Sequence, residues 1–207
     1  MQLINVDDFE KYAKRKLPAN IYDYYAAGAG DEWTLARNLE SFKKILILPR
    51  VLKNISLPTT QINLLGKEFT SPILIAPTAF QQAAHPEGEI ATAKAAANAG
   101  IGMIVSTMST TTLEDIAQTV DPALLWFQLY MQKDRFVSKQ LVERAEKAGY
   151  QAIVLTVDTP IMGKRERDLR NNFCLPENLK AKNFADTLEI NQQFIGSAVK
   201  NHTDSFF

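Results

Sequence analysis

Short apolar runs alternate with longer segments of helical periodicity along the middle of the chain. The runs are ILIA at 73–76, MIVS at 103–106, LLWFQLY at 124–130 and AIVLTV at 152–157. Between them, the spacing of apolar residues predicts helices over 86–99, near 112–119 and from Asp134 to a stop at Gly149. The pattern therefore predicts four β-strands joined by three helices.

The predicted strands are continuously apolar, which is typical of a parallel sheet that is covered on both faces. Right-handed crossover helices would form the outer layer of such a sheet. The order of the elements therefore predicts an α/β fold. It does not distinguish a doubly wound sheet from a (β/α)8 barrel, and four such units are half of a barrel.

The segments on either side of this repeat follow other patterns. The amino-terminal residues read as short helices, and short β-like pieces on both sides of Gly66 predict a hairpin. After the last strand the periodicity fades into a loop and a polar tail. We expect one domain over 1–207, with a helical segment (1–50), a hairpin (51–72), the strand and helix repeat (73–157), and a loop with a divergent tail (158–207).

Composition excludes several classes of partner. Lysine plus arginine equals aspartate plus glutamate at 23 each, so no net charge attracts nucleic acid or an anionic membrane. No apolar run approaches the roughly 20 residues of a membrane span, and the charged start lacks the apolar core of a signal peptide. Cys174 is the only cysteine, which excludes an internal disulfide and a cysteine-based metal cluster. We expect a cytoplasmic protein that binds a small molecule and no metal.

Candidate chemistry lies at the carboxyl ends of the predicted strands, where both α/β architectures gather functional groups. These positions hold few acids or bases but many hydrogen-bonding groups, which suits a cradle for a flat polar heterocycle. The alternative is that each polar residue only satisfies local backbone groups. The residues are Pro77, Thr78 and Ala79, then Ser106, Thr107 and Met108, then Gln128 and Tyr130, then Thr156 and Asp158, with Arg165 in the next loop.

Four motifs of the chain resemble a known family. They are YDYYAAGAGDEWTL, PILIAPTAFQQAAHPEGE, FQLY and LTVDTPIMGKRERDLRN, in that order. They resemble the FMN-dependent α-hydroxy acid oxidases and dehydrogenases, which include glycolate and lactate oxidases. The resemblance covers residues 1–190 and the amino-terminal half of the usual family chain. It implies a partial (β/α)8 TIM barrel, the first four βα units preceded by an N-terminal helical segment.

The resemblance implies a cofactor, FMN, and residues that bind it. Small residues after the first strand leave room for the isoalloxazine ring, with the Ala79 N–H near flavin N5. Hydrogen-bonding side chains at the next three strand ends would bond the ring and its substituents. The implied cofactor-binding residues are Pro77, Thr78, Ala79, Ser106, Gln128 and Thr156.

The resemblance also implies a substrate site for a small (S)-2-hydroxy acid. Tyr24, Tyr130 and Arg165 match family positions that bind the substrate carboxylate, and a guanidinium fork suits two carboxylate oxygens. Asp158 matches the partner of the catalytic histidine. From the residues alone, Asp158 reads equally as a capping aspartate, and Arg165 as part of a solvated basic run.

Met108 departs from the plant glycolate oxidase pattern, which has tryptophan in the loop after the second strand. A flexible apolar side chain gives the substrate pocket a different shape. L-lactate is therefore favoured over glycolate as the predicted substrate.

The family takes its catalytic histidine, a second arginine and a flavin-side lysine from later strands. The two histidines here, His85 and His202, do not match that histidine motif. General acid–base catalysis contributes about 10² to 10⁴-fold, so we expect the chain alone to be inactive or very weak. We expect a truncated or frameshifted product, or a split enzyme with a complementary carboxyl-terminal half chain.

Other functions stay open at this point. Two unpaired sheet edges favour self-association as a homo-oligomer. A non-catalytic fragment or interaction module without flavin is the alternative to an enzyme. A doubly wound nucleotide-binding domain is disfavoured because no G-x-G-x-x-G follows a predicted strand.

Overall fold

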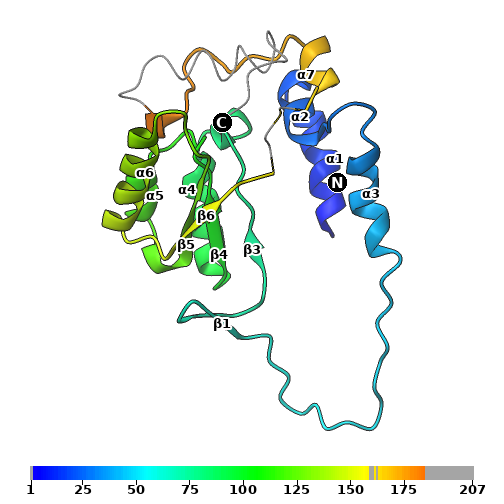
Figure 1. The fold of residues 1–207 in the computed structure, drawn as a ribbon. Helices are drawn as coiled ribbons and strands as arrows, with labels where there is room; N and C mark the ends of the chain where they lie inside the picture. Colours follow the sequence, from blue (N-terminus) through cyan, green and yellow to red (C-terminus); the bar gives the residue numbers. More distant parts are fainter. Residues whose placement is uncertain (1, 159–160, 162, 185–207) are drawn as a thin grey trace. The chain divides into compact units, whose positions relative to one another are not determined.

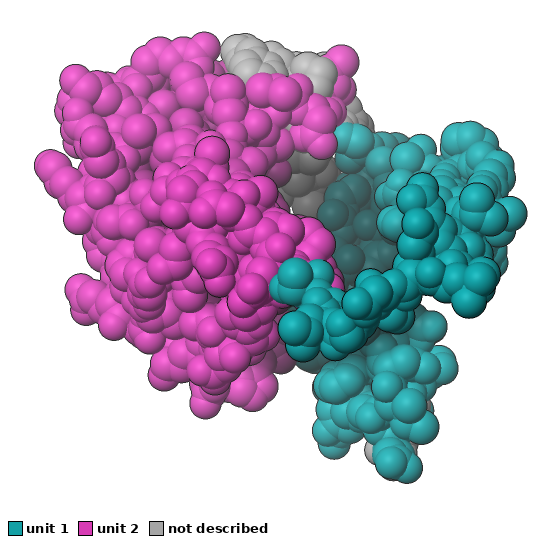
Figure 2. Space-filling view, turned by 90° about the horizontal axis from the view of Figure 1, so that it is seen from below, with its two compact units in different colours: residues 1–59, 163–174 teal, residues 60–162, 175–207 magenta. Residues whose placement is uncertain are grey.

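The computed structural model describes residues 2–158, 161 and 163–184. The chain forms two compact units, which Figure 2 shows in different colours. The helical unit comprises the described residues of 1–59 and 163–174, and the sheet unit comprises those of 60–162 and 175–207. Among the described residues, no helix is long and apolar enough to cross a membrane.

The helical unit contains α1 (Val6–Lys16), α2 (Ala19–Ala26), α3 (Trp33–Phe42) and α7 (Glu166–Arg170). The Asn5 side chain caps α1 by accepting from the Asp8 N–H at 3.0 Å. Helix α7 joins this unit through Arg167, whose guanidinium pairs with Asp23 at 3.5 Å and also with Glu32. A segment distant in the sequence is therefore tied to the amino-terminal helices.

Residues 43–61 form no helix beyond α3 and no strand before Ile62, so the helical prediction up to residue 50 is wrong for its last part. This segment carries eight large apolar side chains that are 70% exposed or more: Ile45, Leu46, Ile47, Leu48, Val51, Leu52, Ile55 and Leu57.

A hairpin follows, in which β1 (Ile62–Leu64) pairs antiparallel with β2 (Lys67–Phe69). The two turn residues, Leu65 and Gly66, have φ of 51° and 83°. Positive φ at both central positions is the geometry of a type I′ turn, which matches the twist of paired strands. The turn is further held by the Asn63 side chain, whose Oδ1 accepts from the Gly66 N–H at 3.1 Å.

Four parallel strands form the sheet (Figure 1), in the order β3-β4-β5-β6. They are β3 (Leu74–Ile75), β4 (Gly102–Val105), β5 (Leu125–Leu129) and β6 (Ala152–Leu155). The connecting helices are α4 (Gly88–Asn98), α5 (Leu113–Ala117) and α6 (Arg135–Lys147). The α/β prediction is confirmed, with each strand and helix near its predicted position.

The strand order separates the two candidate architectures. A doubly wound sheet reverses its order at a switch point, whereas this sheet runs in sequence order throughout. Helix α4 contacts α5, and α5 contacts α6, so the three helices form one layer. Successive right-handed crossovers onto one face are the arrangement of a (β/α)8 barrel.

The core lies between this helix layer and one face of the sheet. Paired residues Val105 and Phe127 are fully buried, as is Leu141 of α6 at 1% exposed. The Phe127 ring meets the Tyr150 ring edge to face, with centroids 6.0 Å apart. This packing fixes the strands on which the candidate site is built.

Strand β6 differs from the expectation that both sheet faces are covered. Ile153 pairs with Phe127 and so lies on the helix-facing side, yet it is 40% exposed, and Leu155 is 50% exposed. In the described sheet β6 pairs only with β5. An edge strand without a following helix packed on it leaves these side chains in solvent.

Candidate functional site

Gln128, at the end of β5, is the centre of a hydrogen-bonded cluster and is 2% exposed. Its Oε1 accepts from the Thr107 N–H at 3.1 Å, and its Nε2 donates to Thr156 Oγ1 at 2.8 Å. Three neighbouring strand ends are thereby linked through one amide. This directness follows from the parallel sheet, whose carboxyl ends lie at one edge.

Thr107 and Ser106 complete this cluster on the β4 side. The Thr107 hydroxyl donates to the Gln128 carbonyl and accepts from the Tyr130 N–H at 3.3 Å. Ser106 Oγ accepts from the Met108 N–H at 3.1 Å. We call Ser106, Thr107, Gln128 and Thr156 the strand-end cluster.

Each of three cluster side chains keeps a donor hydrogen after these bonds. The Ser106 and Thr156 hydroxyls act as acceptors in them, and Gln128 uses one of its two Nε2 hydrogens. The cluster can therefore donate up to three hydrogen bonds to acceptors of a bound molecule.

The loop after β3 presents small residues and backbone. Pro77 and Thr78 are exposed and Ala79 is half-buried. The loop is fixed to its neighbour where the Phe80 N–H donates to the Met108 carbonyl at 3.1 Å. Pro77–Ala79 thus leave exposed surface beside the end of β4.

Tyr130 and Asp158 lie near each other in the sheet unit. Burial raises the pKa of the Tyr130 hydroxyl above its usual value, and the negative charge of Asp158 raises it further. Electrostatic interaction at this strength requires proximity, so the ends of β5 and β6 bring these two predicted residues together.

Arg165 and Tyr24 lie together in the helical unit. The Arg165 Nη2 donates to the Tyr24 carbonyl, and its Cζ lies 5.2 Å from the Tyr24 ring centroid. On its other side the Tyr24 ring stacks on Phe173, with centroids 4.5 Å apart and planes 7° apart. The predicted substrate residues therefore divide between the units, with Tyr130 in the sheet unit.

Asp168 orients Arg165 and was not predicted from the sequence. Its Oδ2 lies 2.8 Å from Arg165 Nε, three residues earlier in the chain. Burial raises the pKa of the Asp168 carboxyl, although the Arg165 cation acts to lower it. The spacing of three residues in RERD is the one signal that pointed to this pair.

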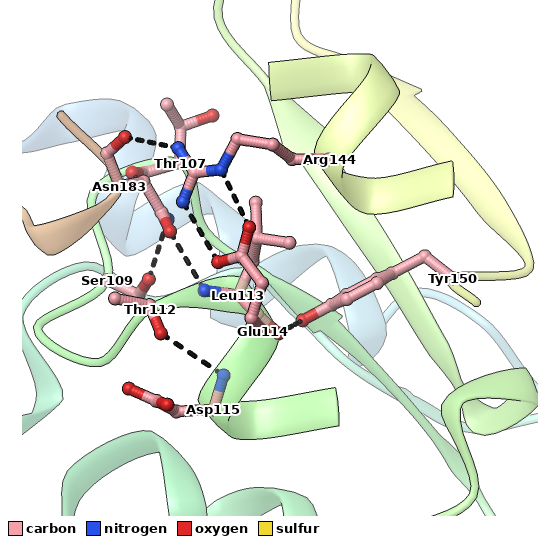
Figure 3. Close-up of polar contacts among 9 residues, drawn as sticks. All are labelled: Thr107, Ser109, Thr112, Leu113, Glu114, Asp115, Arg144, Tyr150 and Asn183. Atoms are coloured by element: carbon pink, nitrogen blue, oxygen red, sulfur yellow. Dashed lines mark hydrogen bonds and ion pairs between the residues drawn. The ribbon is translucent and has the colours of Figure 1, made fainter. Parts of the chain in front are cut away.

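Asn183 is a second residue that sequence reasoning missed (Figure 3). It is 4% exposed, and its Nδ2 donates to the Thr107 carbonyl at 3.1 Å and to Ser109 Oγ at 2.9 Å. Its own carbonyl accepts from Arg144 Nη1 at 2.7 Å. A segment beyond the predicted sites thus holds the loop that follows β4.

Other predicted positions are less informative. Met108 is buried at 5% exposed. His85 is exposed, and its Nδ1 accepts from the Glu87 N–H at 3.3 Å, which is a local contact at a helix start. His202 and the rest of the tail lie outside the described residues. Within the described ranges, no group of three or more His, Cys, Asp or Glu side chains could hold a metal ion.

Comparison with known proteins identifies relatives over most of the chain. The model of the family described as FMN-dependent dehydrogenase matches residues 13–206. Glycolate oxidase of Spinacia oleracea is 52% identical over 187 residues, and glycolate oxidase 3 of Oryza sativa subsp. japonica is 52% identical over 185 residues. Each alignment covers 89% of this chain and 50% of the relative.

Solved structures of mandelate-oxidising proteins share the fold. Mandelate oxidase with (S)-4-hydroxymandelic acid superposes with a TM-score of 0.88 at 41% identity, over 97% of this chain and 56% of that one. The active chimera of (S)-mandelate dehydrogenase gives 0.84 at 41% identity, over 88% and 51%. The fold is therefore a partial TIM barrel, and the chain spans about half the length of the curated relatives it matches. The family match passes residue 191, so it does not support divergence from that point.

Proposed function

Because this chain belongs to the FMN-dependent dehydrogenase family, we propose that it forms the amino-terminal half of an FMN site that oxidises a small (S)-2-hydroxy acid to the 2-oxo acid. The observation that carries the proposal is the strand-end cluster, in which Gln128 is bonded to both Thr107 and Thr156. A cluster of uncharged donors at the carboxyl ends of barrel strands is suited to a heterocyclic cofactor.

The residues present fit FMN. The ring of a flavin has carbonyl oxygens and ring nitrogens that accept hydrogen bonds, and Ser106, Gln128 and Thr156 retain donors. Pro77–Ala79 offer exposed backbone and small side chains against which a flat ring can lie. We propose these six residues as the contacts of this chain with the cofactor. When bound, FMN supplies the acceptor for the α-hydrogen and two electrons of the hydroxy acid.

The substrate carboxylate is assigned to Arg165, Tyr24 and Tyr130. Arg165 has five N–H donors, of which Nη2 engages the Tyr24 carbonyl and Nε lies against Asp168. The Nη1 hydrogens remain to pair with a carboxylate oxygen. Tyr130 stays protonated at neutral pH because burial raises the pKa of its hydroxyl, so it can donate a hydrogen bond to the same substrate.

Proton abstraction needs a group that this half does not provide. Asp158 would orient a histidine that comes from another segment, and His85 is engaged at the start of α4. We therefore propose that oxidation requires a complementary polypeptide carrying the remaining half of the family chain. The chain alone is expected to be inactive or very weak.

We propose L-lactate over glycolate as the substrate. The relatives named glycolate oxidase are 52% identical, which supports the class of small hydroxy acids. Met108 in the loop after β4 supports a pocket of different shape from the plant enzymes. The one cysteine, Cys174, is exposed and unbridged, which suits the reducing cytoplasm that we propose as the location.

Fluorescence titration of the purified chain with FMN tests the proposal. The chain should quench flavin fluorescence saturably, and Gln128→Leu should weaken the affinity at least about tenfold, because a buried amide with two partners is lost. Gln118→Leu alters an exposed glutamine and should leave the affinity unchanged.

Absence of saturable quenching by the unmodified chain would contradict the proposal, as would equal affinity of the Gln128→Leu variant. The first result would favour a module that binds no flavin.

A further inference from the structure

Glu89 is a fully buried carboxylate in the first turn of α4, at 0% exposed. Within the described ranges it has no ion pair. Buried carboxylates are rare unless paired or fully hydrogen-bonded, because removing a charge from water is costly. Its environment therefore needs a reason, and the proposed oxidation does not use it.

The hydrogen bonds of Glu89 come from two different loops. Its Oε1 accepts from the Gln81 N–H at 3.1 Å, in the loop after β3. The same oxygen accepts from the Thr110 N–H at 2.8 Å, and Oε2 accepts from the Thr111 hydroxyl at 3.0 Å, both in the loop after β4. One carboxylate thus joins the loops that follow two adjacent strands.

Thr110 adds a second link between the same loops. Its hydroxyl lies 2.8 Å from Glu89 Oε2, and it accepts from the Gln82 N–H at 3.1 Å. Because a hydroxyl has one hydrogen, acceptance from Gln82 directs that hydrogen to Glu89. The carboxylate therefore also fixes the orientation of the group that holds Gln82.

Gly88 allows the carboxylate to reach this position. It has a φ of 45°, and a Cβ added there would lie 2.6 Å from Gln82 Cγ. A side chain at this position would push the start of α4 away from the loop after β3. The sequence PEGE thus places a glycine where the helix must approach closely, directly before the buried glutamate.

We propose that Glu89 is a positioning residue of the flavin site, a buried carboxylate that locks the loop after β3 to the loop after β4. This inference rests on the proposed function, because Pro77–Ala79 and Ser106 belong to these two loops. Locking keeps the surface against which the ring lies at a fixed distance from the donors at its edge. Asn183 holds the same β4 loop through the Thr107 carbonyl, so that loop is fixed from two elements.

Amide hydrogen exchange on the full chain tests the lock without cofactor. Glu89→Gln should speed exchange of the Phe80 and Gln82 N–H groups about tenfold or more, because an amide cannot accept all the donors that a carboxylate accepts. Neither N–H bonds to Glu89 itself, so their exchange reports coupling between the loops. Exchange of Phe127 and Leu129 in β5 should stay unchanged. Glu87→Gln, an exposed change in the same turn, is the matched control.

A second pair of variants applies if Glu89→Gln does not fold. Thr110→Val removes the bridging hydroxyl and should speed exchange at Gln82, whereas Thr110→Ser retains it and should restore slow exchange. FMN affinity measured in parallel should fall for Thr110→Val and recover for Thr110→Ser.

Equal acceleration of all amides, β5 included, would overturn the inference, since that result means general destabilisation. Unchanged exchange at Phe80 and Gln82 in both loss variants would also overturn it. If the unmodified chain bound no FMN while the exchange pattern held, the proposed function would fail and the loop coupling would stand.

Discussion

At the scale of single residues, uncharged donors dominate the candidate site. The strand-end cluster is built from two threonines, a serine and a glutamine, and Gln128 uses both ends of its amide within the protein. Such a site binds through geometry more than through charge, so changes in shape should alter its selectivity more than changes in pH.

Substrate choice should respond to residue 108. In the chain complemented by a carboxyl-terminal half, we expect L-lactate to be the better substrate, and Met108→Trp should lower the L-lactate to glycolate ratio of kcat/KM about tenfold. A larger ring at this position leaves less room for the lactate methyl group. Steady-state kinetics with both acids measures the ratio.

Leu57→Trp is the control, since Leu57 is 92% exposed in the segment before the hairpin. An unchanged ratio in the Met108→Trp enzyme would show that this residue does not shape the substrate pocket.

At the scale of elements, an ion pair joins the helix layer to the segment that carries Asn183. Arg144 of α6 pairs with Glu114 of α5, with Nε to Oε1 at 2.7 Å and Nη2 to Oε2 at 2.9 Å, and it also donates to the Asn183 carbonyl (Figure 3). The bond from Arg144 holds the pKa of the Glu114 carboxyl below its ordinary value of 4.5.

Stability should therefore depend on pH through Glu114. A carboxyl with a depressed folded pKa stabilises the protein above its unfolded value, here 4.5, and this contribution is lost as pH falls below that value. Glu114→Gln should lower the free energy of unfolding at pH 7 by about 0.5–1 kcal/mol, since the pair is partly exposed, with little effect below pH 4.5.

Urea denaturation at both pH values measures this effect. Glu143→Gln removes a longer pair, Lys139 to Glu143 at 3.7 Å, and should keep the wild-type pH dependence. An equal loss of stability at acidic and neutral pH in Glu114→Gln would contradict the ion pair's role.

The elements differ in how far the sequence could predict them. Strand β5 was expected over 124–130 and spans Leu125–Leu129, because its apolar run is bounded by Asp121 and Pro122 on one side and polar residues on the other. The hairpin is shorter than the range 51–72, because an apolar segment such as ILIL reads as structured without showing what it packs on. Neither periodicity nor local spacing reveals such a partner.

The supporting contacts of the site were not predictable from local pattern. Glu89 meets Thr110 across 21 residues of sequence, and Asn183 meets Thr107 across 76. The cluster residues were found because strand ends can be located from apolar runs. Their supports come from a helix start and a later segment, whose partners are set only by the tertiary fold.

At the scale of the whole molecule, the sheet unit is half of a closed structure. Strands β3 and β6 each pair with one strand in the described sheet, and β6 exposes Ile153 and Leu155. Closing a barrel removes such edges, so a polypeptide with the remaining family strands is the partner we propose. Self-association of this chain is the competing outcome.

The central claim is that this chain supplies one half of a working FMN site. The most direct measurement is anaerobic flavin absorbance of the chain copurified with the carboxyl-terminal half of glycolate oxidase from Spinacia oleracea, before and after L-lactate or glycolate is added. We predict a yellow complex whose flavin absorbance is bleached by the hydroxy acid, and loss of both properties in Gln128→Leu with Thr156→Val. A colourless complex, or a yellow one that neither acid bleaches, would contradict the claim.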